Sequence, residues 1–364
     1  MIQAPPAQLG QRLQDVDTPA LILELGAFEK NQKTLFDLVK KRVRVRPHAK
    51  THKCPEVAKR QIALGAVGMC CQKVSEAEAM VDGGVGDVLV SNEIVGEKKL
   101  ERLAALSRRA KIGVCVDHPD NVRALASSGG KLDVYIEIDV GMRRCGVQPG
   151  EPAVALAMEI LKYKNLKFAG LQAYHGRAQH IRSMEERHAV IEKAAQHVAH
   201  TKRLLKEAGI PCPIVTGAGS GTFMLEVESG LWDEIQPGSY AFMDTDYAKN
   251  DWAAPLPRFE HALFVLTTVM SRPSASMAIV DAGLKASSVD SGMPGVWKRE
   301  GLRYTRASDE HGWLEGAPAP ALGEKVLLVP GHCDPTINLY DWYVVIKDGS
   351  VVDLWPITAR GALS

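Results

Sequence analysis

The sequence lacks the features that mark a secreted or membrane-bound protein. Its seven cysteines form no CxxC pair and are odd in number, so we expect reduced and mostly buried thiols. No run approaches the roughly 18 apolar residues of a membrane span. The first residues, MIQAPPAQLGQRLQD, lack the apolar core of a secretory signal. These absences predict a cytoplasmic protein with no membrane partner.

The sequence also lacks an excess of either charge, with 44 Lys and Arg against 43 Asp and Glu. That balance gives no basic footprint for nucleic acid. Hydrophobic residues make up 46% and charged residues 24%, as is usual for a globular enzyme. The length of 364 residues exceeds the roughly 250 of a single (β/α)8 barrel. A barrel with a smaller appended domain therefore fits the length.

Short, β-branched apolar runs alternate with longer amphipathic segments between about residues 43 and 240. Eight strands are predicted, at 43–50, 68–73, 87–91, 111–117, 132–139, 166–174, 214–217 and 234–237. Helical patterns lie between them, for example over 97–109 and 184–208. Eight strands in strict alternation with helices predict an α/β fold, a closed parallel (β/α)8 TIM barrel.

The pattern changes after about residue 245. Segments such as HALFVLTTVMS, KVLLVPGH and WYVVIKDGSVVDLWPI are rich in β-formers, and DG and SG pairs mark turns between strands. This pattern predicts an appended antiparallel β domain. The strand predicted over Thr18–Leu25 could belong to either part. We expect the barrel to span 26–245, and 1–25 with 246–364 to form the β domain.

The first predicted strand runs into RPHAKTHK, where barrel enzymes place their chemistry. A buried Lys50 among the cations Arg46, His52 and Lys53 should have its amine pKa lowered, which suits a Schiff-base lysine. The alternative is an exposed cation at a strand end, and these residues alone leave the two possibilities equal.

A glycine-rich loop, TGAGSGT at 216–222, follows the seventh predicted strand, where barrels commonly bind phosphate. Such a loop lets backbone N–H groups approach a phosphate closely. The following segment PGSYAF, at 237–242, could supply further donors. The loop lacks the lysine of a P-loop, so by itself it is a weak signal.

Several motifs in order give the sequence a family resemblance: RPHAKTHK, LQAYHG, GSYAFMD, DAGLKA, DEHG and PGHCDPT. They resemble the D-threonine aldolase and D-serine dehydratase group of the alanine racemase-like, fold type III pyridoxal-phosphate enzymes. The resemblance extends from about Asp17 to the C-terminus. It implies a pyridoxal 5'-phosphate cofactor, a barrel plus a β domain, a homodimer and an amino acid substrate.

The resemblance also implies roles for single residues. Lys50 would bond the cofactor as a Schiff base, and Arg144 would face the pyridine nitrogen. Family members often have TGGGTGS in place of TGAGSGT, a change that keeps the backbone donors. The residues expected to bind the cofactor are Lys50, Gln72, Arg144, Tyr174, Thr216, Gly219, Ser220, Gly221, Thr222, Ser239 and Tyr240.

PGHCDPTINLYD places His332, Cys333 and Asp334 in a row. In an extended chain residues i and i+2 face the same side, so His332 and Asp334 could share a metal while Cys333 turns away. Imidazole and carboxylate suit Mg²⁺ or Mn²⁺. A strand-end histidine before a turn aspartate is the alternative, and the motif match favours the metal. Dehydratases of the resembling group have Cys two residues after the His, whereas aldolases have Asp, as here.

The resemblance therefore implies cleavage of a D-3-hydroxy amino acid, such as D-threonine, to glycine and an aldehyde. The alternatives are a D-3-hydroxyaspartate aldolase that yields glyoxylate and a D-serine or hydroxyaspartate dehydratase. We expect His180 to be the base that takes the hydroxyl proton, with His175 as its rival. Basic side chains at the rim could contact the substrate and its distal carboxylate: His52, Arg177 and His311.

Two other proteins with this barrel are less compatible with the sequence. An alanine racemase would have no use for a His-x-Asp metal pair. A barrel-only pyridoxal-phosphate-binding protein would lack the β-rich region of about 120 residues that follows the barrel here.

Overall fold

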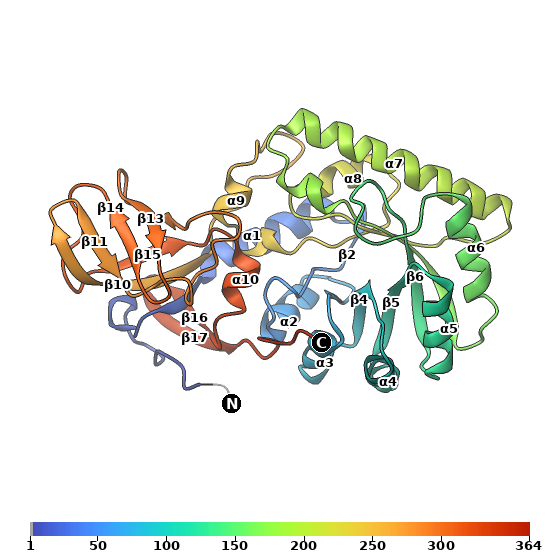
Figure 1. Ribbon diagram of the computed structural model, residues 1–364, viewed down its shortest axis with the longest axis horizontal. Helices are drawn as coiled ribbons and strands as arrows, with labels where there is room; N and C mark the ends of the chain where they lie inside the picture. The colour runs from blue at the N-terminus through green and yellow to red at the C-terminus, as the bar shows by residue number, and fades with distance from the viewer. Residues whose placement is uncertain (1–2) are drawn as a thin grey trace.

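The structure is a computed structural model that describes residues 3–364. It contains an eight-stranded parallel sheet and a nine-stranded, mostly antiparallel sheet. Figure 1 shows the two side by side, with the parallel sheet in blue to yellow and the second sheet mostly in orange and red. Among the described residues, no helix combines the length and the apolarity needed to cross a membrane.

The parallel sheet forms a closed barrel. Its strands are β2 (Arg44–Val45), β3 (Met69–Cys71), β4 (Asp87–Glu93), β5 (Lys111–Val116), β6 (Leu132–Glu137), β7 (Leu166–Ala173), β8 (Val215–Gly217) and β9 (Glu234–Ile235). They pair in the order β2-β9-β8-β7-β6-β5-β4-β3. A parallel bridge between His48 and Cys70 joins the two end strands of this order. The eight predicted strands and the barrel are therefore confirmed.

Helices between the strands form the outer layer, visible in Figure 1. They are α2 (Pro55–Ala63), α3 (Val74–Asp82), α4 (Glu97–Leu106), α5 (Pro119–Ser127), α6 (Glu151–Ile160), α7 (Met184–Glu207) and α8 (Phe223–Ser229), and α1 (Leu25–Val39) precedes the barrel. The long α7 begins where the Ser183 hydroxyl accepts a hydrogen bond from the Glu186 amide. Acidic residues in its first turn and Lys206 in its last turn match the helix dipole.

Alternation along the barrel strands separates two apolar layers. Val88, Val90 and their equivalents on neighbouring strands pack against the helices. The alternate residues Leu89, Cys115 and Tyr135 form a separate cluster that faces the barrel interior. A single larger cluster joins the barrel to the second sheet through α1 and the segment after β9.

The second sheet contains β1 (Ala20–Glu24), β10 (Leu263–Ser274), β11 (Met277–Val280), β12 (Gly295–Val296), β13 (Arg303–Ala307), β14 (Gly312–Glu315), β15 (Lys325–Val329), β16 (Trp342–Lys347) and β17 (Ser350–Pro356). β1 pairs with β10 antiparallel and with β16 parallel, so the strand predicted over Thr18–Leu25 joins this sheet. The appended β region is confirmed, whereas the exact division of the chain into two domains stays a prediction.

Four short helices meet at the mouth of the barrel: η2 (Gly176–His180), η3 (Ser239–Ala241), α9 (Thr245–Ala248) and α10 (Cys333–Ile337). The Asp244 carboxylate, just before α9, accepts a hydrogen bond from the Cys333 amide at 3.0 Å. The Thr245 amide donates to the Pro330 carbonyl at 3.0 Å. These bonds hold the second sheet's α10 against the barrel mouth.

Candidate active site

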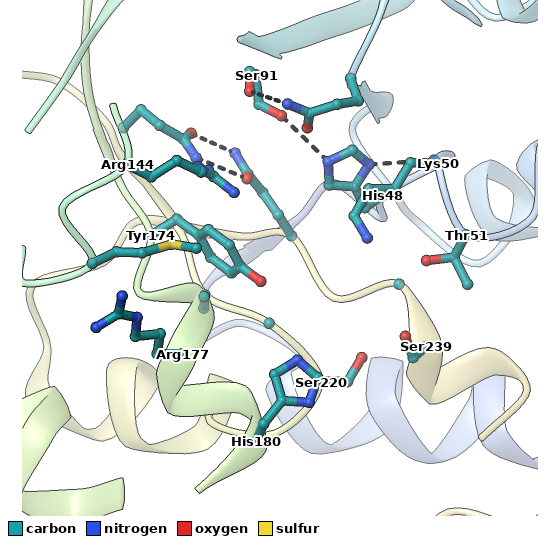
Figure 2. A pocket seen from close by; sticks show the side chains of 18 of the residues that line it. His48, Lys50, Thr51, Ser91, Arg144, Tyr174, Arg177, His180, Ser220 and Ser239 are labelled. Carbon is teal, nitrogen blue, oxygen red and sulfur yellow. Dashed lines mark hydrogen bonds between the residues drawn. The ribbon is translucent and has the colours of Figure 1, made fainter. Parts of the chain in front are cut away.

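A cavity of about 300 Å³ opens at the carboxyl ends of the barrel strands. Figure 2 shows Lys50 and Thr51 on one side of it and Arg144 and Arg177 on the opposite side, with His180 near the lower edge of the view. The lining residues are His48, Lys50, Thr51, Gln72, Ser91, Met142, Arg144, Gln172, Tyr174, Gly176, Arg177, His180, Ala218, Gly219, Ser220, Gln236, Gly238, Ser239 and Tyr247. Nine of the residues predicted from the sequence therefore meet at this one cavity.

Lys50 is the cationic centre of the cavity. Its side chain is 40% exposed, and its ammonium forms an ion pair with the carboxylate of Asp334 from α10. Burial lowers the pKa of the Lys50 amine, but the Asp334 carboxylate outweighs burial and the pKa is raised. The same pair holds the pKa of Asp334 well below its usual range against the effect of burial. The prediction that neighbouring cations lower the pKa of Lys50 is therefore wrong.

The neighbouring cations fail to act on Lys50 because carboxylates neutralise them. Arg46 is 1% exposed, and its guanidinium bonds Glu234 at 2.8 Å and Asp87 at 2.7 Å. The Lys53 ammonium lies 3.0 Å from a Glu76 oxygen in a buried pair. These carboxylates come from other strands and helices, so the local run RPHAKTHK does not reveal them.

The glycine-rich loop after β8 borders the cavity with its backbone. A Cβ added to Gly219 would lie 2.5 Å from the Gln179 Oε1, and one added to Gly238 would lie 2.3 Å from the Thr51 Oγ1. Within the described chain, nothing accepts a hydrogen bond from the backbone amides of Gly219, Ser220 or Ser239. Tight backbone with free N–H groups is the arrangement that fits a phosphate.

Four residues predicted to bind the cofactor make their hydrogen bonds within the protein and do not line the cavity. The Thr216 hydroxyl donates to Glu234 at 2.9 Å, and the Thr222 hydroxyl donates to Glu226 at 2.8 Å. The Gly221 amide donates to Gln179 at 2.9 Å. The Tyr240 hydroxyl is buried against two glutamines, and only its backbone amide reaches Ser220, at 2.9 Å. These residues support the loop without lining the cavity.

Arg144 lies across the cavity from Lys50. Its guanidinium carbon is 5.7 Å from the Tyr174 ring centre, and one of its nitrogens is 3.7 Å from a Glu137 oxygen. Burial and the nearby Glu93 carboxyl raise the pKa of Glu137 to about 8. Gln72, another predicted residue, donates to the Ser91 carbonyl at 3.4 Å.

The two rival histidines differ in position. His180 lines the cavity, and its Nδ1 is 2.6 Å from an oxygen of Asp246. His175 is buried outside the lining set, and its Nδ1 accepts a hydrogen bond from the Ala178 amide at 3.2 Å. Arg177 lies between them on η2 and also lines the cavity. The geometry therefore brings His180, and not His175, to the cavity.

The predicted metal pair has a different local geometry from the one expected. His332 precedes α10 and Asp334 lies in its first turn, so the segment is not extended and the i, i+2 argument for it is wrong. His332 Nδ1 is 2.8 Å from an Asp290 oxygen. Cys333 is buried outside the lining of the cavity, and its thiol lies 3.4 Å from an oxygen of Asp334.

Two predicted substrate contacts are not in the lining set. His52 is buried, its Nδ1 accepts from the Cys54 amide at 3.1 Å, and burial lowers its pKa to about 3. His311 is exposed in the turn between β13 and β14. Neither lies at the cavity of this chain.

The structure also shows polar residues to which the sequence gave no role. His48 accepts a hydrogen bond from the Lys50 amide at 3.3 Å, and its other nitrogen is 3.3 Å from the Ser91 hydroxyl. Burial lowers the pKa of His48 well below its usual range, so the imidazole is neutral. Its place in PHAK, two residues before the lysine, was a usable signal. Asp246 had no such signal because its partner His180 is distant in the sequence.

Two carboxylates and one thiol that follow or end the strands β4, β5 and β6 form a separate group. Its members are Glu93, Asp117 and Cys145, and one potential ligand atom of each lies within 4.8 Å of the other two. Among residues 3–364, this is the group in which at least three potential metal ligands lie so close together. His332 and Asp334 are not part of such a group.

Comparison with known proteins gives a consistent assignment. Residues 23–246 match the alanine racemase N-terminal domain family, and 262–346 match the putative serine dehydratase domain family. The chain is 49% identical to a D-threonine aldolase from Arthrobacter sp., over 98% of this chain and 96% of the relative. It is 44% identical to a 3-hydroxy-D-aspartate aldolase from Paracoccus denitrificans (strain Pd 1222), over 98% and 95% of the two chains.

A solved structure agrees with these relatives. The crystal structure of D-threonine aldolase from Filomicrobium marinum superposes with a TM-score of 0.97 at 52% identity, covering 99% of this chain and 100% of that chain.

Proposed function

We propose that this chain, which belongs to the family of D-threonine aldolase and 3-hydroxy-D-aspartate aldolase, is a carbon–carbon lyase that cleaves D-3-hydroxy amino acids. The products are glycine and an aldehyde. The observation that carries the proposal is the cavity itself, because an amine, Lys50, and a histidine held by a carboxylate, His180, face the same space.

Pyridoxal phosphate fits this cavity. Lys50 would bond it, the backbone amides of Gly219, Ser220 and Ser239 would hold its phosphate, and Arg144 would face its pyridine nitrogen. A cation at that position disfavours protonation of the nitrogen. When bound, the cofactor supplies an electron sink that stabilises negative charge on the substrate Cα.

We propose a divalent cation beside Lys50. His332 and Asp334 would hold it, since a bond from Nδ1 to Asp290 leaves Nε2 of His332 free to bind, as is usual for metal-ligating histidines. Asp334 is ionised and offers an oxygen, and the nitrogen-plus-oxygen donor set suits Mg²⁺ or Mn²⁺. The cation would polarise the substrate hydroxyl and lower its pKa.

His180 is the proposed general base of the reaction. It takes the proton from the substrate hydroxyl as the Cα–Cβ bond breaks, directly or through one water. Lys50, which is half-exposed to the same cavity, can return a proton to Cα once it is free.

Arg177 favours a second candidate substrate, D-3-hydroxyaspartate. In the part of the chain that the structure describes, Arg177 makes no ion pair, yet it lines the cavity. It lies three residues before His180 on a 3-10 helix, where side chains i and i+3 share one side. A guanidinium there can bind a carboxylate attached to the carbon that carries the hydroxyl.

An activity panel tests the substrate. Purified enzyme would be given D-threonine, D-3-hydroxyaspartate and D-serine, with glycine and pyruvate as readouts. We expect glycine from the first two. An Arg177→Met variant should lose activity on hydroxyaspartate by roughly 10- to 100-fold more than on threonine if the guanidinium binds the distal carboxylate. Pyruvate from D-serine as the best reaction would overturn the aldolase proposal.

Two further measurements test the residues. His180→Ala should lower turnover by roughly 10²- to 10⁴-fold with the cofactor still bound, and His175→Ala is the matched control that should stay active. Exhaustive chelation should abolish cleavage, and Mg²⁺ or Mn²⁺ should restore it. The homodimer implied by the family stays a prediction that sedimentation analysis would check.

A further inference from the structure

We propose that Asp246 is a positioning residue that fixes His180 in the one tautomer able to accept a proton from the substrate. This inference rests on the proposed function, in which His180 is the base. Asp246 lies on α9, in the segment that links the barrel to the second sheet, whereas His180 ends η2 after β7. The two side chains meet because η2 and α9 pack together at the barrel mouth.

The contact has the geometry of a charge-assisted hydrogen bond. The His180 Nδ1 lies 2.6 Å from Asp246 Oδ2. Asp246 is 6% exposed, while the His180 ring lines the cavity and also lies 5.6 Å from the Tyr247 ring. The carboxylate is therefore on the buried side of the imidazole, and the substrate space is on the other.

Asp246 is ionised in this position. Burial raises its pKa, but hydrogen bonds from Arg182 and His180 outweigh burial and the pKa is lowered. An ionised carboxylate can only accept hydrogen bonds. The proton of a neutral His180 must therefore be on Nδ1, which leaves the lone pair of Nε2 free to take a proton.

Arg182 fixes the orientation of the Asp246 carboxylate. Its guanidinium bonds Asp246 Oδ1, the Asp246 carbonyl at 2.7 Å and the Asn250 side-chain oxygen at 2.6 Å. The Asn250 amide in turn donates to the Gln179 carbonyl at 2.8 Å, next to His180. Each carboxylate oxygen of Asp246 thus has one fixed partner: Oδ1 serves Arg182 and Oδ2 serves His180.

This arrangement makes Asp246→Asn a sharp test. Arg182 has only donors, so the amide oxygen of the new side chain must stay on its side. The amide NH₂ then faces His180 and donates to Nδ1, which forces the proton onto Nε2 and removes the base. Volume and packing change very little, so the variant changes the tautomer far more than the fold.

Steady-state kinetics give the first readout. Asp246→Asn should lower kcat by roughly 10²- to 10⁴-fold, as loss of the base does, while KM changes little and cofactor absorbance is unchanged. In a His180→Ala background the same substitution should cause no further loss, because the residue that it acts through is gone. An Arg182→Met, Asp246→Asn double variant should recover part of the activity, since the amide is then free to turn its oxygen to His180.

The tautomer itself gives a readout that does not depend on activity. Enzyme with ¹⁵N-labelled histidine rings should show an Nδ1–H signal that is missing in His180→Ala and changes to Nε2–H in Asp246→Asn. Full activity of Asp246→Asn, an unchanged tautomer, or a large further loss on top of His180→Ala would overturn the inference. If His180→Ala alone keeps full activity, the assigned base is wrong, and that result identifies a failure of the proposed function itself.

Discussion

The barrel contains two groups of paired charges that differ in what surrounds them. In the interior, the Arg46 guanidinium is 1% exposed and pairs with two carboxylates, those of Glu234 and Asp87. At the mouth, Lys50 is held by Asp334 alone and is 40% exposed to the cavity. A pair enclosed by protein can only support the fold, whereas a pair with one open side can exchange its partner for a ligand. Whether a charged pair supports the fold or binds a ligand is therefore indicated better by its exposure and its number of partners than by its charge.

Breaking the mouth pair should have the largest effect. Lys50→Ala is expected to lose all cleavage activity and all covalent cofactor, because its amine is the proposed attachment point. The pair is open on the side of Lys50, whose side chain is 40% exposed, so the free energy of unfolding should fall by only about 1 kcal/mol. Borohydride reduction followed by peptide mapping checks the attachment. Reduced cofactor on Lys53 in the wild type would contradict the assignment.

Breaking the interior group should affect stability first. Arg46→Met removes the one buried cation beside the fully buried Glu234 and leaves it only the partly exposed Arg44, which should lower the free energy of unfolding by about 3 kcal/mol. Arg44 is the matched control, because it also contacts Glu234, at 3.2 Å, but is 38% exposed. Arg44→Met should cost only about 0–1 kcal/mol. Denaturant unfolding of both variants measures the two losses of unfolding free energy. Equal losses would show that burial of the arginine does not decide how much the ion pair contributes to stability.

The carboxyl of Glu137 lies between these two cases, because it is buried but its charge is only partly neutralised by Arg144. Burial and Glu93 raise its pKa from 4.5 to about 8, although Arg144 opposes the shift. The folded protein then binds more protons than the unfolded chain between those values, so stability should fall as pH rises from about 5 to 8. Glu137→Gln should remove a part of that fall on the order of 1–3 kcal/mol. Unfolding curves of both proteins at several pH values measure it, and parallel pH dependences would exclude Glu137 as the cause.

The smallest effect is expected at Cys333, which lies beside the mouth pair without lining the cavity. Cys333→Ser keeps a small hydrogen-bonding side chain near Asp334, so kcat should change less than about threefold and stability by about 1 kcal/mol. Kinetics with and without added Mn²⁺ test this. A strong loss that extra metal restores would instead place the thiol among the metal ligands.

The barrel could be predicted from the sequence because its signal is local. Each strand is a short β-branched run, and the helix after it shows its own periodicity. The Lys50 pKa could not be predicted, because the carboxylate that raises it lies on α10, far along the chain. The same distance hid Asp246 from His180.

The metal segment shows a second kind of limit. His332, Cys333 and Asp334 follow the strand β15, and their pattern gave no sign that a helix starts there. The helix start depends on a tertiary contact, the hydrogen bond from the Cys333 amide to Asp244. Local patterns can therefore name the residues of the site, but contacts between distant segments set their geometry.

Closure of the barrel at β2, which pairs with β9 and is bridged to β3 at His48 and Cys70, has a consequence for how the enzyme folds. The bridge lies two residues before Lys50 and joins the first strand of the barrel to the second, whereas the pairing of β2 with β9 joins the first strand to the last. Contacts between such distant segments form late in folding, because long loops must first be closed. Lys50 therefore reaches its final surroundings only when the whole ring has assembled. Binding of the cofactor at Lys50 therefore indicates that the barrel has folded completely. A partly folded chain has no formed site that could retain the cofactor.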